Sequence, residues 1–271
     1  MSGDARPIGV FDSGVGGLTV LRALQARLPR ESTLYLGDTA RVPYGTKSSA
    51  VVTRYSLKNA EFLVERDIKL LVVACNTATA AALPALEQSL SIPVVGVIAP
   101  GARAAAAVAP ASGHVAVIGT PATIKSGAYS HALRALRPDV EVLGRACPLF
   151  VPLAEEGWTT GEVPRLVAER YLGDLRGKVD ALVLGCTHYP LLKSVISEVM
   201  GPGTTLVDSA EATAVEVAGV LARTGMLAPE TAPAPHHGFF VTDVPDRFVA
   251  VGAQFLGRPL SGAEQVDISF A

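Results

Sequence analysis

The chain has 271 residues, of which 49% are hydrophobic and 18% are charged, a balance that allows a buried core and excludes global disorder. With a net charge of -2 and no basic stripe, it is not expected to bind nucleic acid. Three cysteines, none in a C-x-x-C pair, are too few for a disulfide framework and favour a cytoplasmic protein with reduced thiols. The apolar stretch 92–119 is interrupted by prolines, Arg103 and His114, so we expect no membrane span.

Short apolar runs alternate with helical patterns along the chain. In chain order we predict a strand over 8–11, a helix over 18–28, a strand over 33–36, a polar loop over 37–46, a helix capped by Ser48, a strand over 70–74, a helix over 77–90 and a strand over 93–98. The alternation then starts again, with strands over 115–118, 140–143, 179–184 and 204–207, helices over 124–136, 164–172, 191–199 and 212–221, a loop over 228–235, a strand over 239–241 and a helix over 248–256. Continuous apolar strands between helices indicate parallel sheets covered on both faces.

Two segments of the first half resemble two segments of the second half. The run 71–77 is similar to 182–188, since each has an apolar strand, a small residue, a cysteine and then polar residues. The run 9–13 is similar to 117–121, an alignment that pairs Asp12 with Thr120. Cys75 lies 63 residues after Asp12, and Cys186 lies 66 residues after Thr120. We therefore predict an internal duplication, with two α/β halves that each carry a cysteine at the end of a strand.

Cys75 and Cys186 are the candidate reactive groups. Ligands of open α/β sheets bind beyond the carboxyl ends of the strands, and each cysteine is expected there, at a helix N-terminus that favours the thiolate. Two matched thiols can remove a proton from one face of a carbon atom and return one to the other face, which inverts its configuration. The alternatives are two small buried side chains, or disulfide exchange if the sulfurs lie within bonding distance. Cys147 lacks this context, and we interpret it as a packing residue.

Polar residues beside the two cysteines suit an amino-acid substrate. Asn76, Thr77 and Thr187 could hold a carboxylate, or they could simply cap helices. Asp12 follows the first predicted strand and could receive an ammonium group. His188 could orient or polarise the substrate, or it could be a structural hydrogen bonder.

Other types of site fit the sequence less well. The glycine-rich turn 14–17 with Asp38 imitates a dinucleotide site, but Thr19 stands where the third glycine belongs and Asp12 would repel a pyrophosphate. The cysteines and histidines match no standard zinc spacing, and no lysine stands out as a Schiff-base residue for pyridoxal phosphate. We therefore expect no cofactor and no metal. A binding module without catalysis stays an alternative that leaves the paired cysteines without a purpose.

Five sequence segments carry a family resemblance. They are GVFDSGVGG at 9–17, DTARVPYG at 38–45, ACNTA at 74–78, ACPLFVPL at 146–153 and GCTHYPLL at 185–192. In these segments the chain resembles the glutamate racemases, cofactor-independent enzymes that supply D-glutamate for peptidoglycan synthesis. The resemblance implies two doubly wound parallel-sheet α/β domains related by pseudo-two-fold symmetry, with the active site between them. We expect residues 1–97 with 209–271 to form the first domain and residues 98–208 to form the second.

The same resemblance implies roles for the site residues. Cys75 would deprotonate D-glutamate, and Cys186 would deprotonate L-glutamate. The substrate-binding residues would be Asp12, Ser13, Tyr44, Gly45, Asn76, Thr77, Thr187 and His188. Carboxylate contacts in the second domain would come from Thr120 and Thr123. Asp12 and His188 would assist the thiols, together with Glu155 or Glu156, and the sequence leaves open which of these two glutamates faces the site.

The resemblance also extends to the setting of the enzyme. It implies a cytoplasmic homodimer that acts in cell wall biogenesis and so supports cell shape. Because the chain begins only a few residues before Ile8, we expect no activation by a cell-wall precursor. Aspartate racemases and other two-cysteine racemases are the alternative, and the segment 186–190 favours glutamate over aspartate.

Overall fold

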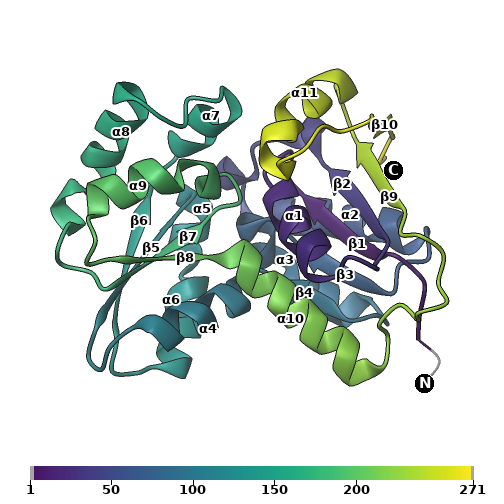
Figure 1. The fold of residues 1–271 in the computed structure, drawn as a ribbon, viewed down its shortest axis with the longest axis horizontal. Helices are drawn as coiled ribbons and strands as arrows, with labels where there is room; N and C mark the ends of the chain where they lie inside the picture. The colour runs from purple at the N-terminus through teal and green to yellow at the C-terminus, as the bar shows by residue number, and fades with distance from the viewer. Residues whose placement is uncertain (1–2, 270–271) are drawn as a thin grey trace.

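The structure, a computed structural model, describes residues 3–269 and consists of two lobes that lie side by side, each built around one parallel sheet (Figure 1). The first sheet has the strand order β10-β9-β2-β1-β3-β4, and the second has the order β6-β5-β7-β8. The strands are β1 Ile8–Asp12, β2 Thr33–Gly37, β3 Leu70–Val73, β4 Val94–Gly96, β5 His114–Gly119, β6 Glu141–Ala146, β7 Ala181–Gly185, β8 Thr205–Asp208, β9 His237–Val241 and β10 Glu264–Gln265. The fold is therefore of the two-lobed parallel α/β class that the sequence predicted.

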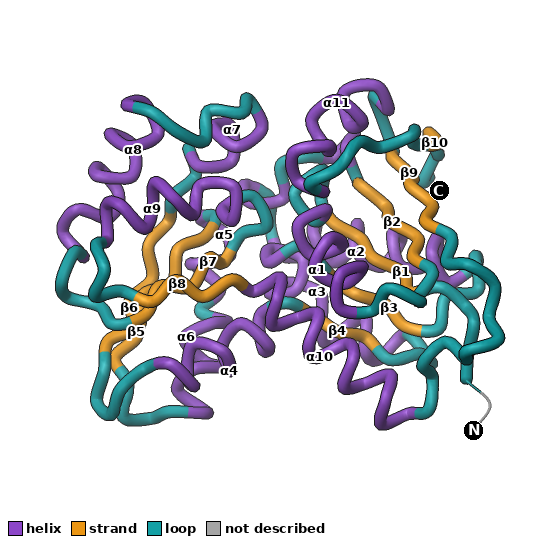
Figure 2. The backbone as a smooth tube through the Cα atoms, viewed as in Figure 1, coloured by secondary structure: helices purple, strands orange, loops and turns teal. Residues whose placement is uncertain are grey.

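Helices cover both faces of each sheet. They are α1 Leu18–Arg27, α2 Ser49–Val64, α3 Asn76–Ser89, α4 Ile98–Val108, α5 Pro121–Ser126, α6 Ala128–Leu136, α7 Phe150–Glu155, α8 Glu162–Leu172, α9 Lys193–Met200, α10 Ser209–Thr224 and α11 Pro245–Leu256. The cap predicted for α2 is present, since the Ser48 side chain accepts a hydrogen bond from the Val51 N–H. Figure 2 shows the strands of each lobe enclosed between these helices.

The first sheet is buried on both faces. On one face, Ile8, Val10 and Val72 pack against α1, α10 and α11. On the other face, Phe11 and Val73 pack against α2 and α3. Successive side chains of a strand point to opposite faces, so a strand covered on both sides must be apolar throughout. Each fully buried Val, Ile or Phe stabilises the lobe by about 1.5–3 kcal/mol relative to an exposed one.

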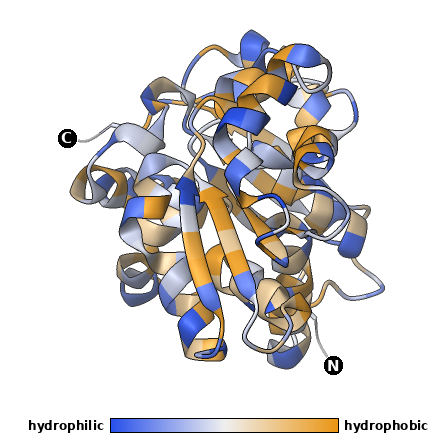
Figure 3. Ribbon diagram, turned by 90° about the vertical axis from the view of Figure 1, so that its left-hand side faces the viewer, coloured by the Kyte–Doolittle hydropathy of each residue, from blue (hydrophilic) through white to orange (hydrophobic). Residues whose placement is uncertain are grey.

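The second sheet is built in the same way. Ala116 and Ile118 pack against α7, α8 and α9, whereas Val115 and Val117 pack against α4 and α6. Figure 3, which views the molecule from the side of this lobe, shows hydrophobic strands flanked by helices with hydrophilic outer segments. Both sheets are therefore the central layer of a three-layer lobe.

The central strands of the two sheets have the same order, as expected for an internal duplication. The order β2-β1-β3-β4 of the first sheet corresponds to β6-β5-β7-β8 of the second. In each lobe the first strand of the repeat lies in the middle of the sheet, with its carboxyl end beside the carboxyl end of the strand that precedes the cysteine. Both cysteines thus lie at equivalent edges of equivalent sheets.

The strand register shifts the alignment of the two halves by one residue. In the first sheet, Val73, which lies two residues before Cys75, pairs with Phe11. In the second sheet, Leu184, which lies two residues before Cys186, pairs with Ile118. The counterpart of Thr120 is therefore Ser13, and the alignment of Thr120 with Asp12 was wrong. Chain separation alone did not reveal this because the loops between the paired strands differ in length.

Some elements differ from the sequence prediction. The strand predicted over 93–98 is only Val94–Gly96, and the residues that follow form α4. The helix predicted over 124–136 is divided into α5 and α6, because Gly127 has a φ of 68° and ends α5 in a left-handed conformation. Helices α4 and α7 and the short strand β10 were not predicted. Among residues 3–269, no helix combines the length and the apolar character needed to cross a bilayer.

Candidate active site

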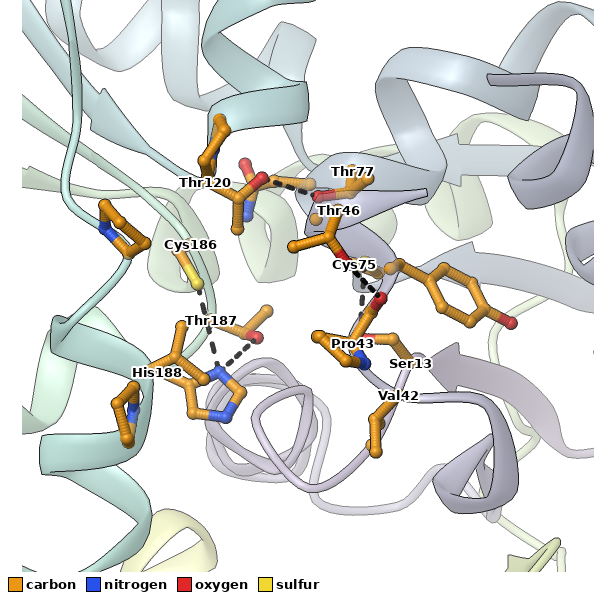
Figure 4. A pocket seen from close by; sticks show the side chains of 18 of the residues that line it. Ser13, Val42, Pro43, Thr46, Cys75, Thr77, Thr120, Cys186, Thr187 and His188 are labelled. Carbon is orange, nitrogen blue, oxygen red and sulfur yellow. Dashed lines mark hydrogen bonds between the residues drawn. The ribbon is translucent and has the colours of Figure 1, made fainter. Parts of the chain in front are cut away.

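One pocket lies between the lobes and takes side chains from both (Figure 4). Its volume of about 200 Å³ suits a small molecule, since pockets for drug-sized ligands occupy about 300–1,000 Å³. The first lobe contributes Ser13, Gly14, Val42, Pro43, Tyr44, Gly45, Thr46, Cys75, Asn76 and Thr77. The second lobe contributes Thr120, Pro121, Pro148, Val151, Pro152, Glu155, Cys186, Thr187 and His188. The carboxyl ends of β1 and β3 therefore face those of β5 and β7.

Of the residues predicted for the site, Asp12 and Thr123 do not line this pocket. Asp12 is fully buried, and its Oδ2 accepts a hydrogen bond from the Gly14 N–H at 3.0 Å. Burial raises the pKa of Asp12, although the charge of His188 opposes this. The Asp12 carboxylate therefore lies behind the lining of the pocket, bonded to the glycine-rich turn, and its contact with the substrate stays a prediction.

Cys75 is the N-cap residue of α3. Its Sγ accepts a hydrogen bond from the Ala78 N–H at 3.4 Å and lies 3.7 Å from Ser13 Oγ. Burial and the nearby Asp12 carboxylate nevertheless raise the pKa of Cys75 to about 12. The prediction that the helix N-terminus lowers the pKa of Cys75 is therefore wrong. Removal of the thiol from water raises this pKa by more than the hydrogen bond at the helix N-terminus lowers it. At neutral pH its sulfur carries a proton.

Cys186 lies in a different electrostatic environment. It is followed by a 3₁₀ helix over Tyr189–Leu192, and α9 begins only at Lys193, so Cys186 does not cap an α-helix as the sequence suggested. Its Sγ lies 3.9 Å from His188 Nδ1. The other ring nitrogen of His188 lies 3.0 Å from Glu155 Oε1. The two cysteines thus have unlike partners despite their equivalent places in the fold.

His188 is held in its protonated form. Burial lowers the pKa of the His188 ring, but hydrogen bonds to Cys186 and Glu155 have the larger effect and raise this pKa to about 10. The same hydrogen bond from His188 lowers the pKa of Glu155, and Arg247 lies 3.8 Å from the second carboxylate oxygen. Glu155 therefore faces the site, whereas Glu156 is exposed and does not line the pocket.

Three threonine hydroxyls join the two lobes at one wall of the pocket. Thr77 Oγ1 of the first lobe lies 2.9 Å from Thr120 Oγ1 and 3.1 Å from Thr123 Oγ1 of the second. Thr120 and Thr123 are themselves 3.0 Å apart, so Thr123 supports the wall from behind. Beside them, Asn76 Oδ1 accepts a hydrogen bond of 2.7 Å from Tyr129, a residue of α6 that sequence analysis did not single out.

Two glycines allow the lobes to approach each other closely. A Cβ atom on Gly16 would lie 2.4 Å from His188 Nδ1, and one on Gly45 would lie 2.7 Å from Thr120 Cβ. Neither distance can be accommodated unless the facing side chain or the lobe that carries it moves. Of the glycines of the 14–17 turn, Gly16 thus serves lobe contact, whereas a Cβ atom on Gly14 or Gly17 would meet side chains of its own lobe.

Sequence analysis missed the apolar wall of the pocket and one covering helix. The wall includes Val42, Pro43, Pro121, Pro148, Val151 and Pro152, several of which belong to the five segments that carry the family resemblance. Helix α11 of the first lobe covers the site from outside, where Phe255 packs edge-on against His188 with ring centroids 5.1 Å apart. Gln254 of α11 donates a hydrogen bond of 3.1 Å to the Ala154 carbonyl of α7. Nothing in the local pattern of α11 marks this contact, because its partners lie about 100 residues away.

The remaining candidate groups lie elsewhere. Cys147 is buried in the core of the second lobe, does not line the pocket, and has its Sγ 3.7 Å from the Arg145 carbonyl, which confirms its interpretation as a packing residue. All three cysteines are free thiols. In the described part of the chain, residues 3–269, no three His, Cys, Asp or Glu side chains are grouped so that they could hold a metal ion.

The fold and the pocket define a two-lobed α/β protein whose lobes each bring one thiol to a small shared cavity. Residues 16–217 match the Asp/Glu/Hydantoin racemase family. A glutamate racemase of Geobacter metallireducens is 62% identical over 264 residues, which cover 97% of each chain. The crystal structure of a glutamate racemase from Francisella tularensis in complex with D-glutamate has a TM-score of 0.90 at 39% identity and covers 98% of each chain. A glutamate racemase from Thermus thermophilus in complex with β-chloro-D-alanine has a TM-score of 0.89 at 48% identity, covering 98% of this chain and 99% of that one.

The chain belongs to the Asp/Glu/Hydantoin racemase family. It is therefore an isomerase, as the sequence resemblance implied.

Proposed function

We propose that this enzyme interconverts L-glutamate and D-glutamate by proton transfer at the α-carbon between Cys75 and Cys186. The observation that carries the proposal is that the two thiols line one small pocket from opposite lobes. Figure 4 shows Cys186 with His188 on one side of the pocket and Cys75 with Ser13 on the other. A planar carbanion between the sulfurs can be protonated from either face, and no chemical group other than a proton needs to move.

The unequal surroundings of the thiols suit the two steps of this reaction. In the L-to-D direction, the Cys186 thiolate takes the α-proton while the Cys75 thiol gives its proton to the opposite face. The protonated ring of His188 stabilises negative charge on Cys186. The raised pKa of Cys75 keeps its proton in place until the carbanion forms. L-to-D turnover leaves Cys75 as the thiolate and Cys186 as the thiol. The reverse reaction starts from this state with the two roles exchanged, so both sulfurs are essential in both directions.

Glutamate is favoured as the substrate by the relatives. The relatives reported above with 39–62% identity are glutamate racemases, and one of them was solved with D-glutamate bound. The hydroxyl and amide groups of Ser13, Asn76, Thr77 and Thr187 line the pocket and can hold the two carboxylates. Aspartate, one methylene shorter, is the alternative substrate for the experiment below to exclude.

We further propose that the product D-glutamate enters peptidoglycan synthesis and so supports cell wall biogenesis and cell shape. The family resemblance supports this role. A cytoplasmic location, a homodimer, and a division into domains of residues 1–97 with 209–271 and 98–208 stay predictions. The proposed division is supported by the sheets, since β1–β4, β9 and β10 form one sheet and β5–β8 form the other.

The substrate can be tested by circular dichroism of L-glutamate and L-aspartate solutions incubated with the protein. We expect the glutamate signal to decay to zero and the aspartate signal to persist. In D₂O, the D-glutamate formed should carry deuterium at the α-carbon, because a thiol exchanges its proton with solvent. If only the aspartate signal decays, the substrate is aspartate and not glutamate. Product without deuterium would contradict proton transfer by two thiols.

Replacing Glu155 with glutamine should shift the alkaline limb of kcat/KM to lower pH. Glu155 raises the pKa of His188, so its loss lets the His188 ring give up its proton at a lower pH. The measurement is the pH profile of glutamate racemisation, with the His188 ring titration followed by NMR. The matched control is Glu156→Gln, which removes the same charge from the neighbouring exposed position. Coincident profiles for the two variants would contradict a role for Glu155 in setting the charge of His188.

A further inference from the structure

A second buried carboxylate near the pocket has no role in the proton transfer. Asp38 follows β2, is fully buried and does not line the pocket. Burying a carboxylate is costly unless its oxygens are paired with donors. Asp38 is paired on both oxygens, with Arg41 and Thr242 at one and Tyr44 and Asn59 at the other.

The first oxygen of Asp38 ties the turn after β2 to the C-terminal part of the chain. Arg41 donates to Asp38 Oδ1 at 2.9 Å, and the same guanidinium donates to the Ile268 carbonyl at 2.6 Å. Thr242, which follows β9, donates to Asp38 Oδ1 at 3.0 Å and accepts a hydrogen bond of 2.9 Å from the Ala40 N–H. The segment around Asp38 is thus anchored to residues about 200 positions away.

The second oxygen of Asp38 holds Tyr44, which does line the pocket. The Tyr44 hydroxyl donates to Asp38 Oδ2, and Asn59 donates to the same hydroxyl at 3.0 Å. Burial and the Asp38 carboxylate raise the pKa of Tyr44 far above its ordinary value, so the hydroxyl remains a donor. Because this hydroxyl is bonded to Asp38 and Asn59, which do not line the pocket, Tyr44 does not offer it to a ligand.

Residues 42–46 form one wall of the pocket. This wall is bonded to Asp38 through Tyr44 and packs against the second lobe through Gly45. All five residues of this wall line the pocket, and a Cβ atom on Gly45 would contact Thr120 of the opposite lobe. A shift of the Tyr44 ring would move Gly45 and so alter both the pocket and the contact between the lobes. The placement of the wall thus depends on a carboxylate that does not itself line the pocket.

We propose that Asp38 is a positioning residue that sets the wall 42–46 for substrate binding, and that Thr242 and Ile268 of the C-terminal segment support it from behind. This inference rests on the proposed racemisation of glutamate. The wall carries neither of the sulfur atoms that exchange protons with the substrate, and it lines the pocket that both enantiomers would enter. Its displacement should therefore weaken binding of L-glutamate and D-glutamate alike and leave the proton-transfer step largely intact.

The direct test is Asp38→Asn, which keeps the shape and removes the charge. We expect KM for both enantiomers to rise in parallel by at least about tenfold, the lower end of the effect of losing a hydrogen bond to a charged group. We expect kcat to change by less than about twofold, since the thiols keep their positions. A merely structural role would lower the amount of folded enzyme, and so apparent kcat, without changing KM.

Two milder substitutions at Thr242 test the same inference in case Asp38→Asn does not fold. Thr242→Val has the same shape but lacks the hydroxyl, and Thr242→Ser keeps the hydroxyl and loses a methyl group. The valine variant should raise KM for both enantiomers, and the serine variant should behave as the wild type. Since Thr242 is only partly buried, both variants are expected to fold.

The matched control is Glu31→Gln, at the opposite end of β2. Like Asp38, Glu31 is a buried carboxylate paired with a cation, Lys69, but its oxygens bind Lys69 and the Ala228 N–H and no residue of the wall 42–46. This variant should lower stability and leave KM unchanged. If the wild type racemises glutamate and both Thr242→Val and Asp38→Asn fold but keep the KM of the wild type, this inference is overturned and the proposed function stands. Failure of the wild type to racemise glutamate would overturn the proposed function and this inference with it.

Discussion

Replacing either Cys75 or Cys186 with serine is expected to lower kcat for glutamate racemisation by at least about 100-fold and up to about 10,000-fold, the range for loss of a positioned acid or base. A serine hydroxyl is a far weaker acid than a thiol, so it can neither hold the negative charge after proton removal nor release a proton readily. In the proposed mechanism each sulfur serves one face of the α-carbon, so the remaining thiol cannot complete the inversion. Both variants should lose activity in both directions.

The measurement is the rate of change of the circular dichroism signal, starting from each enantiomer in turn. Cys147→Ser is the matched control, since it makes the same atomic change in a buried cysteine that does not line the pocket. It should retain nearly full activity, because the Cys147 sulfur packs in the core of the second lobe. Near wild-type activity in Cys75→Ser or Cys186→Ser would remove that sulfur from the mechanism.

Replacing Lys69 with methionine is expected to lower the free energy of unfolding by about 3–5 kcal/mol, as breaking a buried ion pair does. Lys69 is fully buried, and its Nζ lies 2.5 Å from Glu31 Oε2. The ammonium group also donates to the carbonyls of Asp4 and Met226 at 2.6 Å and 2.8 Å. One side chain thus joins the N-terminal segment, the loop between α1 and β2, and the loop after α10. Its removal leaves the Glu31 carboxylate buried without its counter-charge.

Urea unfolding of Lys69→Met and of Lys58→Met separates this buried pair from an exposed one. Lys58 lies 2.7 Å from Glu61 on the surface of α2, and its loss should cost no more than about 1 kcal/mol. The double variant Lys69→Met with Glu31→Gln should recover part of the stability lost in Lys69→Met, because no unpaired charge is then buried. Equal unfolding midpoints for the two single lysine variants would contradict the stabilising role of the buried pair.

The sequence by itself determined the architecture and the position of the two thiols. The apolar runs that end before Cys75 and Cys186 specify strands buried on both faces, and the repeat of that pattern specifies two lobes. Alternation of apolar runs with amphipathic segments depends only on neighbouring residues, so it can be read without the fold. The same local pattern distinguished Cys147 from the other two cysteines.

The tertiary structure decided the chemical state of the site. The pKa of Cys75 is raised although it caps a helix, because the depth of burial is set by the packing of both lobes. Strand register made Ser13 the counterpart of Thr120, and the fold turned Glu155 toward His188 and Asp38 toward Thr242. Desolvation and hydrogen bonding depend on which groups are close in space, and partners tens to hundreds of residues apart leave no local pattern in the chain.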